Sequence, residues 1–107
     1  MSYDRIDQLL KFLQLNSRDS FVKYALALEY INEGDDEKGK FYFNEILQND
    51  PDYVGTYYHL GKLYERLNEK SLAKETYREG LKRSEGKDGR TYQELQEALN
   101  QLLYEDE

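Results

Sequence analysis

The chain aligns with itself, without a gap, when it is shifted by 34 residues. The matching positions carry large or small side chains in both copies: Tyr24 with Tyr58, Leu26 with Leu60, Ala27 with Gly61, Tyr30 with Tyr64, Gly39 with Ala73, Phe43 with Tyr77 and Leu47 with Leu81. A fixed period of this length is typical of stacked supersecondary units, because each unit buries its apolar face against its neighbours. The repeat therefore restricts the chain to an array of short, similar units.

Each unit is predicted to be a hairpin of two helices. In the second copy, Tyr57, Leu60 and Tyr64 recur at the spacing of one helix face. Asn68 follows, and asparagine tolerates the left-handed conformation that ends many helices. A second helical pattern follows, and one side of this helix carries Leu72, Ala73, Tyr77 and Leu81. Because the turn is so short, the two helices must fold back antiparallel, and the small residues Gly61 and Ala73 would let their backbones approach closely.

Two further helices are predicted before Pro51. Residues 4–15 carry an apolar stripe, and residues 20–33 are apolar almost all round, so this second helix must be covered on several sides. Asp19 or Ser20 can cap its start, and Gly34 can end it in the left-handed conformation. The stripe of the first helix consists of Ile6, Leu9, Leu10 and Leu13.

A third helix and a last helix complete a prediction of six. The acidic run Asp35 to Glu37 suits the positive start of a helix that Pro51 then stops. Thr91 and Glu94 read as a capping box that opens a helix running to about Tyr104. The expected packing faces are Phe41, Phe43, Ile46 and Leu47 in the third helix and Leu95, Ala98, Leu99 and Leu102 in the last. The fold class is therefore all-α, with no strand.

Size and charge narrow the class of partner. A chain of 107 residues is one domain. The net charge of −7 argues against nucleic acid and against an anionic membrane surface, since both require a Lys/Arg-rich face. The absence of cysteine excludes thiol chemistry and suits a reducing cytoplasm. We find no apolar run long enough to span a membrane and no signal peptide, so a cytoplasmic location is expected.

At these positions the sequence resembles the tetratricopeptide-repeat family, as a small two-repeat protein of bacterial type. The family pattern is W-x-x-L-G-x-x-Y, A-x-x-x-F and then P. The second copy matches it with Tyr57, Leu60, Gly61 and Tyr64, followed by Ala73 and Tyr77. The first copy departs from the pattern most at Lys23, which replaces the tryptophan; Phe21 or Tyr24 could supply the missing ring.

The resemblance implies antiparallel helix hairpins stacked in a right-handed superhelix. Its expected division of the single domain 1–107 is a capping helix at 4–15, repeats at 20–53 and 54–87, and a second capping helix at 90–104.

The resemblance also implies a concave groove, lined by the first helix of each repeat, that binds peptides or proteins. The groove positions are Phe21, Tyr24, Leu28, Ile31 and Asn32 in the first repeat and Gly55, Tyr58, His59, Lys62, Glu65 and Arg66 in the second. Tyr24 and Tyr58 are the best candidates for recognition, since tyrosine is favoured at interface centres. Alternatively, the terminal helices could cover Phe21, Leu28 and Ile31. The lysines and asparagines with which one branch of the family clamps chaperone tails are not present at these positions.

No catalytic, cofactor or metal site is predicted. His59 is the only histidine and has no evident partner for base catalysis or zinc binding. The acidic run Asp35 to Glu37 lacks the glycine and the distant glutamate of a calcium loop. The sequence therefore predicts a non-catalytic module that binds a protein or peptide. The alternative is a structural unit that forms homodimers, or larger homo-oligomers, by filling its apolar groove through self-association.

Overall fold

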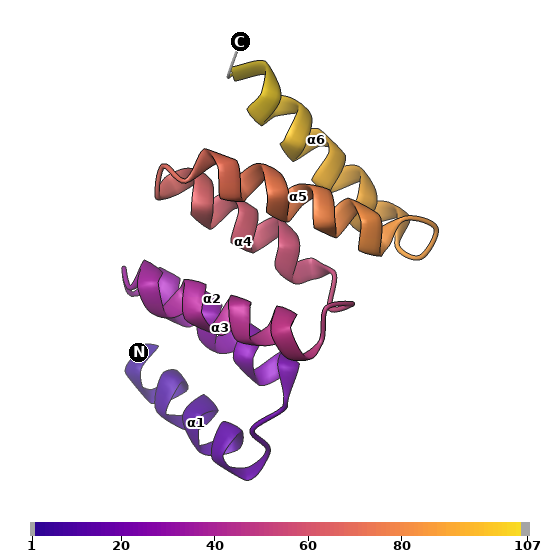
Figure 1. Ribbon diagram of the computed structural model, residues 1–107. Coiled ribbons are helices and arrows are strands. Elements are labelled where there is room, and N and C mark those ends of the chain that lie inside the picture. Colours follow the sequence, from indigo (N-terminus) through magenta and orange to yellow (C-terminus); the bar gives the residue numbers. More distant parts are fainter. Residues whose placement is uncertain (1, 106–107) are drawn as a thin grey trace. The chain divides into compact units, whose positions relative to one another are not determined.

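The computed structural model describes residues 2–105 of the chain, with side chains from Asp4 to Glu105, and within that range every regular element is an α-helix (Figure 1). The six helices are α1 (Ser2–Leu15), α2 (Ser20–Asn32), α3 (Asp36–Asn49), α4 (Gly55–Arg66), α5 (Lys70–Ser84) and α6 (Gly89–Glu105). The all-α prediction is confirmed. The helices form two compact units, which meet in the sequence after Tyr53.

The first unit contains α1, α2 and α3, and α2 packs against both of the others. This arrangement explains why α2 is apolar almost all round. Its core joins the predicted α1 stripe to α2, through the buried side chains Ile6, Leu9, Val22, Ala25 and Leu26. On the α3 side, Phe43 and Ile46 are fully buried. The Tyr30 and Tyr42 rings stack with centroids 5.9 Å apart and planes 1° from parallel, and both pack against this core.

The second unit is the α4–α5 hairpin with α6 packed on both of its helices. Tyr57, Leu60 and Tyr64 are buried on α4, as their spacing predicts. The α6 stripe is also buried: Leu95 is 0% exposed and Leu102 is 1% exposed. The last helix is therefore an integral layer of this unit and not a tail.

The helix ends follow local chemistry. The Asp19 carboxylate accepts from the backbone N–H of Val22 at 3.1 Å, and Asp35 accepts from that of Lys38 at 3.1 Å. Gly34 has φ +86° after α2, and Asn68 has φ +62° after α4. Asn68 is the only non-glycine residue with positive φ among those described, which confirms it as a left-handed helix end.

Three local predictions are wrong. Thr91 and Glu94 do not open α6: Asp88 caps it, accepting from the Thr91 N–H at 3.1 Å and from the Thr91 hydroxyl at 2.9 Å, so the helix begins two residues before Thr91. Phe41 is 57% exposed and Leu72 is 40% exposed, so neither belongs to the packing face predicted for it. On α3 the neighbouring Tyr42 packs on the α1–α2 core instead of Phe41; on α5 the predicted face is buried at Ala73 but not at Leu72.

Candidate functional site

The α2 row of predicted groove residues belongs largely to the packing of the first unit. The Tyr24 ring lies 6.1 Å from that of Phe43 and 5.7 Å from that of Tyr53, in tilted contacts. Ile31 packs on Gly39 of α3: a Cβ atom added to Gly39 would lie 2.5 Å from Cγ1 of Ile31. Leu28 is half-buried and Asn32 is exposed. Tyr24 and Ile31 therefore support the hairpin, whatever else they contact.

Phe21 is 63% exposed, so the structure leaves its ring uncovered. The prediction that Phe21 could replace the missing tryptophan ring is therefore wrong, and α1, the terminal helix of the same unit, does not cover this ring. Tyr24, with its contacts to Phe43 and Tyr53, is the ring that packs in this part of the unit.

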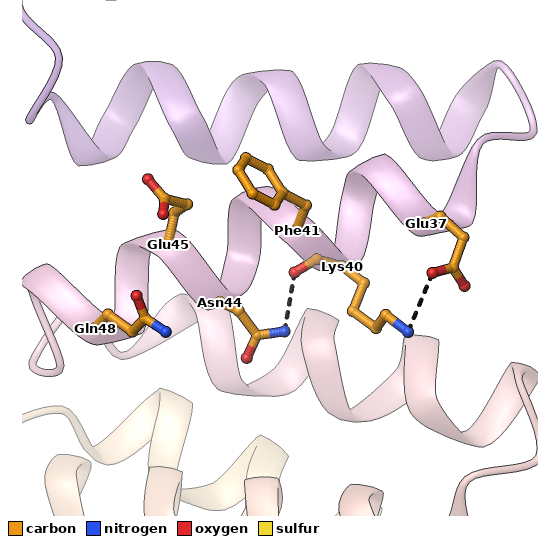
Figure 2. A pocket seen from close by; sticks show the side chains of 6 residues that line it. All are labelled: Glu37, Lys40, Phe41, Asn44, Glu45 and Gln48. Atoms are coloured by element: carbon orange, nitrogen blue, oxygen red, sulfur yellow. Dashed lines mark hydrogen bonds and ion pairs between the residues drawn. The ribbon is translucent and has the colours of Figure 1, made fainter.

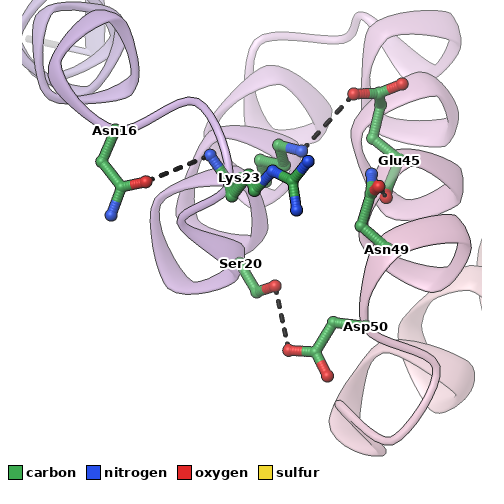
Figure 3. Close-up of polar contacts among 7 residues, drawn as sticks. Asn16, Ser20, Lys23, Glu45, Asn49 and Asp50 are labelled. Carbon is green, nitrogen blue, oxygen red and sulfur yellow. Dashed lines mark hydrogen bonds and ion pairs between the residues drawn. The ribbon is translucent and has the colours of Figure 1, made fainter.

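Lys23 is buried at the tryptophan position, with only 4% of its surface exposed. Its ammonium lies 3.4 Å from Oε1 of Glu45 on α3, as Figure 3 shows, and Glu45 is still 37% exposed. In the same region the Ser20 hydroxyl donates to Asp50 Oδ2 at 3.0 Å. The buried Lys23 side chain and its contact with Glu45 thus take the place that an aromatic ring has in the family pattern.

The second unit contains a surface hollow of about 500 Å³ between α4 and α6. We call it the α4–α6 hollow; its lining is Tyr58 and Lys62 from α4 and Glu94, Glu97, Ala98 and Gln101 from α6. It brings together two of the predicted groove residues, Tyr58 and Lys62. The other residues predicted on α4 do not line it: Gly55, His59 and Glu65 are half-buried, and Arg66 is exposed.

A set of charged contacts holds the α4 side of the hollow. The Lys62 ammonium lies 5.6 Å from the centroid of the Tyr58 ring and 3.8 Å from Glu65 Oε2. The Tyr77 hydroxyl donates to the same Glu65 oxygen. Burial, followed by the hydrogen bond to Glu65, raises the pKa of the Tyr77 phenol, so it remains a donor at neutral pH. Tyr77 thereby fixes Glu65, and the Lys62 ammonium lies within reach of both this carboxylate and the Tyr58 ring.

His59 lies next to this set, with its ring in an edge contact 5.7 Å from that of Tyr58. Burial lowers the pKa of the imidazole, and the nearby Glu94 carboxylate opposes that shift only in part. The neutral ring is therefore favoured at pH 7. Among residues 2–105 no group of three or more His, Cys, Asp and Glu side chains is placed to hold a metal ion.

A second hollow, of about 390 Å³, follows one face of α3 (Figure 2). Its lining is Glu37, Lys40, Phe41, Asn44, Glu45 and Gln48. Lys40 is already paired with Glu37 at 3.2 Å, and the Asn44 side chain donates to the Lys40 carbonyl at 3.0 Å. These polar groups are therefore engaged within α3, and Phe41 is the large apolar side chain that the face leaves exposed.

Comparison with known proteins decides the family. The model of a family described as tetratricopeptide repeat matches residues 22–53 and 54–86. The chain belongs to the tetratricopeptide-repeat family. This family is typically non-catalytic and generally serves protein interaction. No curated protein matches the sequence.

Solved structures of tetratricopeptide-repeat proteins resemble this chain in fold. A crystal structure of a tetratricopeptide-repeat domain protein from Salinibacter ruber is 42% identical, with a TM-score of 0.74; the alignment covers 78% of this chain and 94% of that one. A solution structure of the Salinibacter domain gives a TM-score of 0.76 at the same identity, over 78% of this chain and 86% of that one. A crystal structure of MamA, at 23% identity and a TM-score of 0.73, covers 80% of this chain and 47% of that one and shares the fold.

Sequence reasoning missed the α6 side of the α4–α6 hollow. It treated the last helix of this tetratricopeptide-repeat chain as a cap and predicted no groove residue on it. The available signal was the position of Glu94, Glu97 and Gln101 beside the apolar stripe of α6. Residues that flank a buried stripe line the edge of the helix contact, so they face any hollow that the contact leaves.

No helix within residues 2–105 combines the length and the apolar character that crossing a bilayer requires.

Proposed function

We propose that the protein is a non-catalytic interaction module that binds a peptide or helix of a partner protein on the faces of α2 and α4. In this proposal residues 20–53 and 54–87 are the two repeats, and residues 4–15 and 90–104 are the capping helices. The proposed partner-binding residues are Phe21 on α2 and, on α4, Tyr58 and Lys62.

The observation that carries the proposal is the α4–α6 hollow. It is an open hollow of about 500 Å³ that presents one aromatic ring with charged and polar groups around it. Tyrosine in such a place offers a rigid contact surface at little cost in conformational entropy. Family membership independently favours a protein partner.

The test is selection of ligands from a displayed library of random twelve-residue peptides against the full chain. Amide shift changes in nuclear magnetic resonance spectra would then locate the binding surface of a selected peptide. We expect the changes to cluster around Tyr58, Lys62 and the facing turns of α6. Failure to select any peptide, or changes confined to α3 and α5, would contradict the proposal.

A second candidate is self-association, as a structural unit. Leu15 is 85% exposed and Phe12 is 56% exposed, both on α1, and Tyr104 near the end of α6 is 76% exposed. Such side chains can seed contacts between copies of the chain. Molar mass measured by light scattering over a hundredfold range of concentration decides: a constant monomer mass removes this candidate, and a concentration-dependent dimer supports it.

A further inference from the structure

We infer that the α4–α6 hollow binds a cationic side chain, arginine in preference to lysine, from a basic segment of the partner protein. The inference rests on the proposed function and specifies the chemistry of the ligand at one place in it.

The Tyr58 ring is the first part of this site. Lys62 already places an ammonium 5.6 Å from the ring centroid, within the distance at which a cation is attracted to an aromatic face. The ring face is thus accessible from the hollow and accommodates a positive charge. The Lys62 side chain is 42% exposed, and its ammonium is 3.8 Å from Glu65, so it can turn toward that carboxylate and leave the ring to a ligand.

The charges that face the ring are the second part. Glu94 and Glu97 lie one turn apart on α6 and both line the hollow. Glu94 has Arg90 at 3.9 Å, but the Arg90 side chain is 91% exposed, and such surface pairs are weak in water. Glu97 has only the amide of Gln93 beside it, at 3.4 Å, within the part of the chain that the structure describes. Since Lys62 is balanced by Glu65, the α6 wall is left with uncompensated negative charge.

The shape and the polar groups favour arginine. Ala98 is a small residue on the lining, and the volume of about 500 Å³ is ample for one long side chain. A planar guanidinium can donate to a carboxylate through two parallel hydrogen bonds while it stacks on an aromatic ring. Gln101 also lines the hollow; its amide nitrogen donates to Glu105 Oε1 at 3.4 Å, and its side-chain carbonyl oxygen can accept from the peptide backbone. The net charge of −7 would also speed the encounter with a basic partner at low salt.

An acidic ligand is a poorer match to the same site. Its carboxylate would find Lys62 already in contact with Glu65, and it would face Glu94 and Glu97 across the hollow. Two like charges so close are unfavourable, whereas a cation meets attraction from the ring and from both carboxylates.

The test compares two capped heptapeptides of glycine, serine and alanine that differ only at the central residue. One carries arginine, and the other carries citrulline, its neutral isostere. Each is titrated into the full ¹⁵N-labelled chain and followed by amide shifts. We expect the arginine peptide to shift residues 58–62 and 94–101, with weak affinity, and the citrulline peptide to leave them unchanged. Equal shifts from both peptides, or no shift in these two segments, would overturn the inference.

Variants then test the role of the carboxylates. Glu97→Gln should weaken binding of the arginine peptide by roughly two- to fivefold, the range expected for one exposed charge contact. Glu75→Gln, an exposed change of equal charge on α5, should leave the affinity unchanged. If both variants weakened binding of the arginine peptide equally, the affinity would depend only on the overall charge of the protein. That result would overturn the inference that the hollow is the binding site.

The two levels of proposal fail in different ways. If displayed peptides bind at Tyr58 without a lysine or arginine, the proposed function stands and this inference is wrong. If the library yields no ligand and the arginine peptide causes no shift, both are wrong.

Discussion

The ring of Tyr77 occupies the space that a side chain at Gly61 would need. A Cβ atom built at Gly61 would lie 2.2 Å from Cε1 of the Tyr77 ring, and Tyr77 is completely buried. This contact brings α4 and α5 together, which confirms the expectation that Gly61 allows the close approach of the two helices. It also positions the Tyr77 hydroxyl to donate to Glu65. The Tyr77 side chain therefore both packs the hairpin and orients a charged group near Tyr58.

Gly61→Ala should destabilise the protein by about 1–3 kcal/mol, because the buried ring of Tyr77 cannot move aside without overpacking the core. The control is Gly89→Ala at the start of α6, where a Cβ atom would meet nothing within 4 Å. There no buried group opposes the added methyl, so this variant should lose little or no stability. Urea unfolding followed by circular dichroism measures both, and equal losses would contradict this account of Gly61.

Lys23→Met should leave the stability nearly unchanged, because methionine fills the same buried space and Glu45, 37% exposed, regains contact with water. Glu45→Ala should be worse, costing roughly 1–3 kcal/mol, because it leaves the Lys23 ammonium buried without its partner. The comparison of the two unfolding midpoints is the measurement. A larger loss for Lys23→Met would show that the ion pair itself holds α2 on α3.

Leu60→Ala should cost about 2–5 kcal/mol, because the side chain is 2% exposed in the core of the α4–α5 hairpin. Leu72→Ala is the control: it is 40% exposed, and a surface change costs no more than about 0.5 kcal/mol. Thermal and urea unfolding of the two variants would distinguish them. A similar loss at both positions would mean that α5 is rotated about its axis relative to this structure.

His59 should titrate below the ordinary histidine pKa, since burial disfavours the imidazolium. Because the folded-state pKa is lowered, His59 contributes stability that is present above the ordinary pKa and is lost as the pH falls through the lowered value. Glu94→Gln should lower the pKa of His59 further, because it removes the carboxylate that favours the charged ring. A pH titration of the imidazole carbon-bound protons tests this, and a raised pKa in Glu94→Gln would contradict it.

Helices and their ends could largely be predicted from the sequence, because apolar spacing, Gly34, Asn68 and Asp35 act locally. The sequence could not predict which of two adjacent apolar residues turns toward the core. Phe41 and Tyr42 are neighbours on α3, and the contact of Tyr42 with Tyr30 decides between them. That contact depends on how far α3 is rotated against α2, a tertiary property with no local signal.

The candidate site was predictable only on its α4 side. Tyr58 and Lys62 are groove positions that the family resemblance implies, but Glu94 and Glu97 join them only because α6 packs against α4. Similarly, Asp88 displaced the predicted cap because its carboxylate accepts from both the Thr91 amide and the Thr91 hydroxyl, two bonds that sequence spacing alone did not favour over Thr91.

The central claim, that the α4 face binds a partner peptide, is tested most directly by titration calorimetry of one selected peptide against three proteins. These are the wild type, Tyr58→Ala and the control Tyr104→Ala, which removes a ring that is 76% exposed near the α6 end. Circular dichroism first establishes that the variants are folded. We predict that Tyr58→Ala loses about 1–2 kcal/mol of binding free energy, as expected for an interface anchor, and that Tyr104→Ala binds as the wild type does. Unchanged affinity in Tyr58→Ala would contradict the claim and place the binding surface elsewhere on the chain.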